Sequence, residues 1–563
     1  MYLRESKQRR ADGSTVSYLQ LAENIWNPER RRSETRVLCN CGRADDPAVT
    51  ERLRKLAGSI LRRCTPEEIV SAGGGDVRLV CAWPYGEVYV LEALWRRLGI
   101  DEVLRKQAQP RRLGFDVERA LFAMVANRAC AQCSKLYCWE QWLKEKVRIP
   151  GTEKLSLQHL YRAMDFLEAN KEPIEREIFH RVADLLNLDV EVLFYDTTSL
   201  HFEIDQPDEG VGPDDIVHGS KAAGRKEYKA PRKHGYAKNG RSDAPQIVVG
   251  LAVTREGFPV RHWVFPGNTV DVTTVAQVKR DLRDWKLTRC LFVGDAGMVS
   301  QDNFKALAEG GGKYLMCMPM RRGDEQIQQV LARAGRYRNV SERLQIKEVV
   351  VGEGERRQRY VLCFNPEEAQ RQQRHRQHVI EELQAELASL GDAAQDLQSK
   401  RVAALRSSRR YGKYLRLGSK GLEIDAKAIK QAQHHDGKFI VHGNDDTLSA
   451  EDMALGYKQL MRVEQAWRDL KSTLDMRPVF HWAVHRIHAH VAITVLSLLL
   501  ERTIEHACGD TWRNVSDRLR RIQLAQLSSP HGTVWQITDP SAEAAKCLKT
   551  LKIKPPPPVL QLA

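Results

Sequence analysis

The stretch from residue 190 to residue 318 constrains the fold most, because its apolar residues form short runs rather than helical stripes. Runs that predict strands are 190–195, 246–253, 259–265, 290–293 and 314–318. Helices are predicted from about Asp271 to Trp285 and from Gln301 onward. The order strand, strand, strand, helix, strand, helix, strand predicts an α/β domain.

Two of these predicted strands end in an aspartate. Asp196 follows the run from Val190 to Tyr195, and Asp295 follows the run that ends at Gly294. Open α/β sheets place their functional sites at the carboxyl ends of strands. One aspartate in such a place is most often a turn residue, whereas two such ends favour a shared site.

The stretch from Ser449 to Pro478 predicts one helix. Ser449 and Asp452 form a capping-box-like start, and Arg477 with Pro478 forms a stop. Apolar side chains recur every three or four residues and predict one buried stripe, at Leu460, Val463, Trp467, Leu470 and Leu474.

A second stripe of this predicted helix carries Tyr457, Glu464, Arg468 and Lys471. A carboxylate between two cations beside a buried stripe suits a helix that offers a charged face to a cleft. The alternative is a solvated face with ion pairs four residues apart, such as Glu464 with Arg468.

The stretch from Ser220 to Arg241 is a basic loop with Glu227 as its one acid and with Tyr228 and Tyr236 among its cations. Cations interleaved with aromatic rings suit a phosphate backbone and unstacked bases. A solvated loop is the alternative. The cations are Lys221, Arg225, Lys226, Lys229, Arg232, Lys233, Lys238 and Arg241.

The whole chain is basic: 88 Lys and Arg against 73 Asp and Glu give a net charge of +15. A polyanionic partner such as DNA, or a merely basic enzyme, would have this charge. The twelve cysteines are scattered and have no paired zinc-ligand spacing, which predicts reduced thiols in a cytoplasmic protein. No signal peptide is visible, and the apolar run from Ala489 to Leu500 is too short to span a membrane, so we expect a core helix and no membrane contact.

The remaining patterns predict the domain organisation. Residues 1–50 form a small basic strand-rich segment, and 51–189 form a helical region that binds DNA or only packs. Residues 190–319 form the first part of the core, and 320–448 interrupt it with a strand hairpin and two charged helices. Residues 449–563 carry the helix described above and a helical C-terminal region, expected to dimerise. Histidines 481, 485, 488 and 490 are expected to be structural or to contact DNA, because no carboxylate accompanies them on their segment.

Tyr457, Glu464 and Lys471 have the spacing Tyr-x6-Glu-x6-Lys, which resembles the Tyr-Arg-Glu-Lys signature of bacterial insertion-sequence DDE transposases. YDTTSLHFE resembles the first-Asp strand of that family, VGDAGMVSQDNF its second-Asp strand, and RVEQAWRDLKSTLDMRP its Glu helix. The resemblance covers about 190–320 and 449–505. The signature arginine is expected at position 460, where this chain has leucine, and Arg462 or Arg468 could supply the charge instead.

The resemblance implies a ribonuclease-H-like α/β core, with an insertion domain of strands and a helical hairpin before the Glu helix and a mostly helical N-terminal region. It implies a catalytic triad of Asp196, Asp295 and Glu464. Three carboxylates suit hard divalent cations, so we expect Mg²⁺ or Mn²⁺ as cofactor, with two ions per site.

The function implied is that of a DNA transposase. Such an enzyme binds the terminal inverted repeats of a mobile element, hydrolyses the DNA at its ends and transfers the 3′-OH ends into target DNA. Tyr457, Lys471 and Arg468 would hold the cut end, within a homodimeric synaptic complex in the cytoplasm, at the nucleoid. The alternatives are an inactive DNA-binding derivative that acts as a repressor, and a structure-specific nuclease on the same core.

Overall fold

The computed structural model divides the chain into two compact units. One comprises Met1–Ala82, Leu524–Thr538 and Pro557–Ala563, and the other comprises Trp83–Gln523 and Asp539–Pro556. The structure describes all residues except 12, 66–77, 112, 189, 205, 209–215, 219–226, 230, 237–240, 242, 286, 288–289, 321–323, 355–356, 391–394, 409, 419–420, 475, 477–478, 530–531 and 561–563.

Among the residues that the structure describes, the smaller unit contains two sheets and the helix α1 (Pro47–Leu61). The strands predicted in residues 1–50 form the first sheet, and helix α1, capped by the Asp46 side chain, contacts it. A second sheet joins β4 (Arg78–Pro84) to three strands that follow Ile522, whereas the sequence predicts helical regions in both places. The strands are β1 (Tyr2–Arg9), β2 (Thr15–Asn27) and β3 (Arg32–Arg43), then β4 (Arg78–Pro84), β18 (Gln523–Ser529), β19 (Gly532–Ile537) and β20 (Val559–Leu560).

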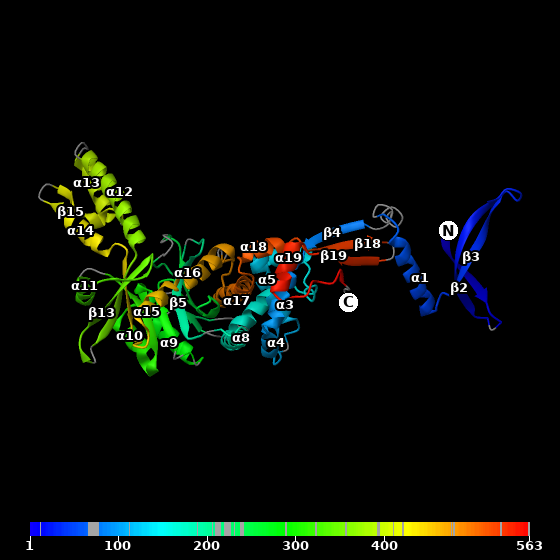
Figure 1. The fold of residues 1–563 in the computed structure, drawn as a ribbon, viewed down its shortest axis with the longest axis horizontal. Helices are drawn as coiled ribbons and strands as arrows, with labels where there is room; N and C mark the ends of the chain where they lie inside the picture. Colours follow the sequence, from blue (N-terminus) through cyan, green and yellow to red (C-terminus); the bar gives the residue numbers. More distant parts are fainter. Residues whose placement is uncertain are drawn as a thin grey trace. The chain divides into compact units, whose positions relative to one another are not determined.

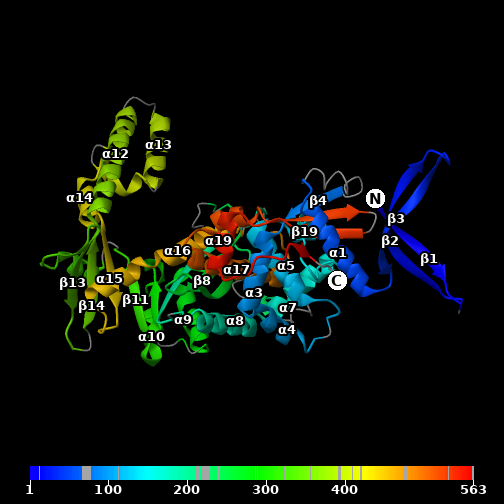
Figure 2. The ribbon, with the colours of Figure 1, turned by 45° about the vertical axis from the view of Figure 1, so that its right-hand side comes forward.

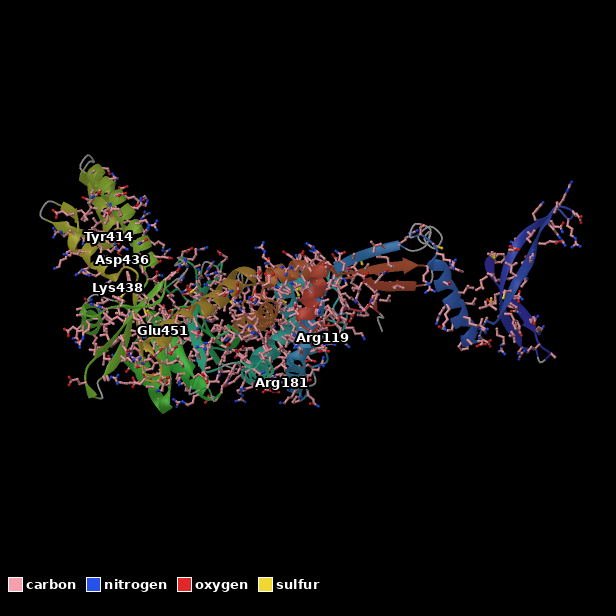
Figure 3. All side chains as sticks on the ribbon, viewed as in Figure 1. Arg119, Arg181, Tyr414, Asp436, Lys438 and Glu451 are labelled. Atoms are coloured by element: carbon pink, nitrogen blue, oxygen red, sulfur yellow. The ribbon has the colours of Figure 1, made fainter. Side chains whose placement is uncertain are left out.

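The larger unit begins with a helical layer, as predicted. The expected stripe on α3 is buried, and Gly99, with a φ of 68°, ends that helix. Ion pairs join the helices: Arg181 contacts Glu102 at 2.7 Å, and Arg119 contacts Glu92 at 2.7 Å. Figure 3 labels the two arginines. The helices are α3 (Gly86–Arg97), α4 (Ile100–Ala108), α5 (Val117–Cys130), α6 (Lys135–Tyr137) with a π-helix (Cys138–Lys146), α7 (Leu157–Ala169) and α8 (Lys171–Leu185).

Helix α17 (Val484–Cys508) is the long apolar helix of this unit. It is long and apolar enough to cross a membrane by length and composition alone, but 89% of its most apolar window is buried inside the protein. It packs against α5, α7 and strand β9. Helices α18 (Trp512–Leu519) and α19 (Ala542–Thr550) come after it in the chain. This burial matches the predicted core helix.

A nine-stranded sheet forms the centre of the larger unit, in the order β12-β13-β14-β17-β11-β10-β5-β8-β9. All five strands predicted between 190 and 318 belong to it. β5 pairs in parallel with β10, which pairs in parallel with β11, whereas β8 and β9 run antiparallel. These strands are β5 (Val192–His201), β8 (Gln246–Val253), β9 (Pro259–Pro266), β10 (Leu291–Gly294) and β11 (Lys313–Met318).

Residues 320–448 contribute both to this sheet and to a separate helical cluster. β17 pairs with β11 on one side and with β14 on the other, so the predicted hairpin continues the core sheet. Helices α12 and α13 lie side by side (Figures 1 and 2) and share a small apolar core with α14, closed by the Arg376–Asp436 ion pair. The elements are α11 (Glu325–Ala332), β12 (Arg338–Ser341), β13 (Leu344–Val351), β14 (Gln358–Phe364), α12 (Pro366–Leu390), α13 (Gln395–Ser407), β15 (Leu415–Gly418), β16 (Gly421–Ile424), α14 (Ala426–His435) and β17 (Lys438–Gly443).

The two faces of the sheet have separate apolar cores. Phe194 and Val293 belong to the core shared with the segment after Ser449 and with α17. Tyr195 and Phe292 belong to the core shared with α9 (Asp271–Arg283) and with Leu307 of α10 (Gln301–Ala308). Because side chains alternate along a strand, this division tells which face each neighbouring residue points to.

Candidate active site

Asp196 lies within β5 rather than at its end, so the prediction that the strand stops there is wrong. β5 pairs with β8 along its length, from Phe194 opposite Val253 to His201 opposite Gln246, and this pairing carries the strand onward. Its parallel pairing with β10, however, ends at Phe194. Asp196 therefore lies just beyond the parallel part of the sheet, half-buried, and shares the face of Phe194.

Asp295 follows the last residue of β10 and is exposed, as the first-turn cap of a short 3₁₀ helix (Ala296–Met298). Val293 is opposite Phe194, so the same register continued by two residues brings Asp295 level with Asp196. Neighbouring strands are about 4.8 Å apart. The two predicted aspartates therefore lie on adjacent chain segments, just beyond the carboxyl end of the parallel pairing of β5 with β10.

The stretch from Ser449 is not one helix. The capping box of Ser449 and Asp452 is present and begins α15 (Ala450–Lys458), but the helix is broken at Gln459 and Leu460, before α16 (Met461–Arg468) and a π-helical turn (Asp469–Thr473). The amide of Leu460 donates to the Tyr457 carbonyl at 2.9 Å, which tightens this turn. The predicted stop at Arg477 and Pro478 lies outside the described residues.

This broken helix covers the face that carries Asp196. α16 contacts β5 and β8, and its predicted stripe is buried. The hydroxyl of Tyr457 donates to Asp295 Oδ1 at 3.2 Å. Burial, together with nearby Cys317 and Asp295, raises the pKa of Tyr457 above its ordinary value, so the phenol keeps its proton. Two of the predicted site residues, Tyr457 and Asp295, are therefore in contact.

Glu464 is exposed on α16, seven residues after Tyr457 and beyond the break at Gln459 and Leu460. Within the described part of the chain, no group of three or more His, Cys, Asp and Glu side chains is close enough to hold a metal ion. The structure therefore shows no shared ligand geometry for Asp196, Asp295 and Glu464. Their catalytic role stays a prediction.

Leu460, at the position of the signature arginine, is 6% exposed and belongs to the core below α16. An arginine here would have to leave its charge in an apolar environment. The side chain of Arg462 lies outside the described residues. Arg468 is exposed, and Lys471 is half-buried on the π-helical turn. Their roles at DNA stay predictions.

Part of the basic loop is engaged in contacts within the protein. Arg232 is 9% exposed, and its Nε donates to Asp208 at 2.6 Å while its guanidinium lies 4.9 Å from the Trp482 ring. Arg241 pairs with Asp243 at 3.0 Å, and Lys233 pairs through its backbone with strand β8. Outside the described residues lie Lys221, Arg225, Lys226, Lys238 and the side chain of Lys229.

The four histidines near the start of α17 are expected to be structural or to contact DNA, and the expectation that they have no carboxylate partner is wrong for two of them. Carboxylates from α7 do accompany them: His485 lies 3.0 Å from Asp165 and His488 lies 3.7 Å from Glu168. Burial, with nearby Lys135, lowers the pKa of His481 to about 3. All twelve cysteines are free, as predicted.

Asp271 lies next to the predicted site, and no feature of the sequence singles it out. It begins α9, and its carboxylate accepts a hydrogen bond from the Thr197 hydroxyl, next to Asp196. The sequence signal was only an acidic residue at the start of a predicted helix, which is common because it complements the helix dipole. Its contact with β5 required the tertiary structure.

Comparison with known proteins gives the family. No curated protein matches the chain. Among solved structures it is similar to the piggyBac transposase synaptic complex with hairpin DNA, with 11% sequence identity and a TM-score of 0.32, over 74% of this chain and 75% of that one. The family model described as "Transposase DDE domain" matches residues 212–500, just over half of the chain. The chain therefore belongs to the transposase DDE domain family.

Proposed function

We propose that this protein is a transposase that cleaves DNA at the ends of a mobile element and joins the 3′-OH ends to target DNA. The observation that carries the proposal is the position of Asp196 and Asp295, each two residues beyond the paired residues Phe194 and Val293 of adjacent strands, with the Tyr457 hydroxyl bonded to Asp295. Family membership supports the same reaction class. The spacing of Tyr457, Glu464 and Lys471 supports a bacterial insertion-sequence enzyme.

The core is proposed to be ribonuclease-H-like. The strand order β9-β8-β5-β10-β11, with the first three antiparallel and the last three parallel, supports this assignment. In this arrangement Asp196 belongs to the central strand, β5, and Asp295 directly follows the strand beside it, β10.

A divalent cation is proposed as the cofactor, and the donor set fits it in chemistry. Asp196, Asp295 and Glu464 offer only carboxylate oxygens, which Mg²⁺ and Mn²⁺ prefer over nitrogen and sulfur donors. One or two bound ions would stabilise the charge on the phosphate and on the attacking and leaving oxygens. Among the described residues the three carboxylates do not share a ligand geometry, so the donor set fits the cation in its chemistry only.

Each residue of the site has a proposed part in the reaction. Asp196, Asp295 and Glu464 would hold the cation, and the Tyr457 hydroxyl orients the Asp295 carboxylate through its hydrogen bond. Lys471 and Arg468 on the following turns would bind phosphates of the cut end, and so would the cations of the loop 220–241. The proposed partners are double-stranded DNA, in particular the inverted repeats, and a second subunit in the synaptic complex. The proposed location is the cytoplasm.

Cleavage of a DNA duplex that carries the element's end, in Mg²⁺, tests the proposal. Asp196→Asn, Asp295→Asn and Glu464→Gln should each lower cleavage at least about 100-fold, because each removes a charge from the ligand set. DNA binding should persist. Asp302→Asn is the matched control, since its side chain is 95% exposed on α10. Wild-type activity in all three site variants would refute the assignment.

Two other functions would give different results. A nuclease would hydrolyse the DNA but would never join the 3′-OH to a target, so a strand-transfer assay separates it from a transposase. A repressor would bind the ends without cleavage in any divalent metal. The burial of Leu460 accounts for an apolar residue at the position of the signature arginine, so that position does not favour the repressor.

A further inference from the structure

The pairing of β5 with β10 does not by itself keep the two aspartates together. The parallel hydrogen-bond ladder ends at Phe194 and Val293, before either aspartate is reached. Two carboxylates at neighbouring positions repel each other until a cation is bound. Some other contact therefore has to hold the turn that carries Asp295 beside β5.

The N-terminus of α9 makes the first such contact. The Thr197 hydroxyl, on a side chain only 2% exposed, donates to Asp271 Oδ1. The other carboxylate oxygen, Oδ2, faces the turn after Asp295: a Cβ atom added to Gly297 would lie 3.4 Å from it. One carboxylate thus contacts β5 next to Asp196 and also borders the turn next to Asp295.

Asn303 on α10 makes the second contact and is 5% exposed. Its Nδ2 donates to the Val272 carbonyl at 2.8 Å and to the Met298 carbonyl at 2.7 Å. The Met298 amide in turn donates to the Asp295 carbonyl at 3.1 Å. A single amide group therefore ties the start of α9 to the turn that carries Asp295.

A third contact gives α9 a second hydrogen bond to β5. The Tyr195 hydroxyl donates to Thr274 Oγ1 at 3.0 Å, one helical turn from the Thr197–Asp271 bond. Tyr195 and Thr197 point to the α9 face of β5, opposite to Asp196. Asp271 therefore acts from behind the strand and not as a further ligand in front of it.

We propose that Asp271 and Asn303 are positioning residues that set the separation of Asp196 and Asp295 for a divalent cation. The inference rests on the proposed function, because it assigns these contacts a purpose only if the two aspartates are ligands. Removal of a group that hydrogen-bonds to a metal ligand commonly changes metal affinity by about 10- to 100-fold. Thr197 is such a group, because its amide donates to Asp196 Oδ1 at 2.7 Å, and Asp271 acts through it.

The test measures Mn²⁺ binding to the full chain without DNA, from the electron paramagnetic resonance signal of the free ion. Thr197→Val and Asp271→Ala should each weaken Mn²⁺ binding about 10-fold. The double variant should be no weaker than either single one, because both changes remove the same hydrogen bond. Asp271→Asn should restore most of the affinity, since its amide oxygen still accepts from Thr197. Thr273→Val, at an exposed position on the same helix turn, is the matched control.

The outcomes separate the possible failures. If Asp271→Asn is as weak as Asp271→Ala, the charge of Asp271 itself matters and the positioning role is wrong. If the variants lower the thermal midpoint but leave Mn²⁺ affinity unchanged, the contacts are only structural, which also overturns the inference. If the wild-type protein binds no Mn²⁺, the proposed function fails first, and this inference fails with it.

Discussion

Replacing Leu460 by arginine tests whether the buried site at position 460 can accept the arginine of the family signature. Leu460 is 6% exposed in the core between α16 and the sheet. Losing its burial costs about 2 kcal/mol. The guanidinium adds a desolvation cost, which is reduced because its long stem can reach solvent beside exposed Met461. We expect a total loss of about 3 kcal/mol in the local stability of α16.

Hydrogen exchange of α16 measures this loss directly. The amides of Val463 and Glu464 both donate to the Leu460 carbonyl, at 3.0 Å and 3.4 Å. A loss of about 3 kcal/mol should speed their exchange about 150-fold, because each 1.4 kcal/mol is a factor of ten. Leu460→Met, which keeps volume and polarity, should change exchange less than tenfold. Unchanged exchange and full cleavage activity with arginine at 460 would refute the buried placement of this side chain.

Three further results are expected. Tyr457→Phe should leave the number of tyrosines that ionise below pH 11 unchanged, as followed by ultraviolet difference spectra, because burial already keeps this phenol neutral; one phenolate fewer near pH 10 would contradict this. The wild-type protein should lose about 2 kcal/mol of its unfolding free energy at His481 between pH 7 and pH 5, and His481→Phe should remove this loss. The folded pKa of His481 is about 3 and the unfolded value is near 6.5, so only the unfolded state binds a proton there as the pH falls. Gly437→Ala should lower the thermal midpoint, because Gly437 has a φ of 65° and a Cβ there would lie 2.3 Å from the Asn365 carbonyl oxygen, whereas Gly58→Ala, with no atom nearby, should not.

Local signals in the sequence predicted the elements well. The capping box of Ser449 and Asp452, the apolar stripe of α3 and the strands flanking Asp295 all depend on neighbours within a few residues. The same is true of the apolar run in α17, which was expected to be a core helix. Capping and periodicity act within one turn or one strand, so they can be read without the fold.

The errors arise where distant segments decide the local structure. β5 continues past Asp196 because β8 pairs with it, and β17 joins the core sheet because β11 offers it an edge. The helix after Ser449 breaks at Leu460, where tertiary packing outweighs a continuous helical pattern. Asp271 looked like any first-turn acid until its contact with Thr197 was seen. Such partners lie tens or hundreds of residues apart and leave no periodic trace.

The place of β17 in the sheet has a consequence for synthesis on the ribosome. β17 fills the gap between β11 and β14, yet it begins at Lys438, 120 residues after β11 ends at Met318. At about 5–20 residues per second, the edge of β11 stays open for about 6–24 s. An open edge recruits other strands, so chains truncated before Lys438 should aggregate more than chains extended past Cys508. The two aspartates thus emerge early, and the segment that carries Glu464 reaches them only after the sheet has closed.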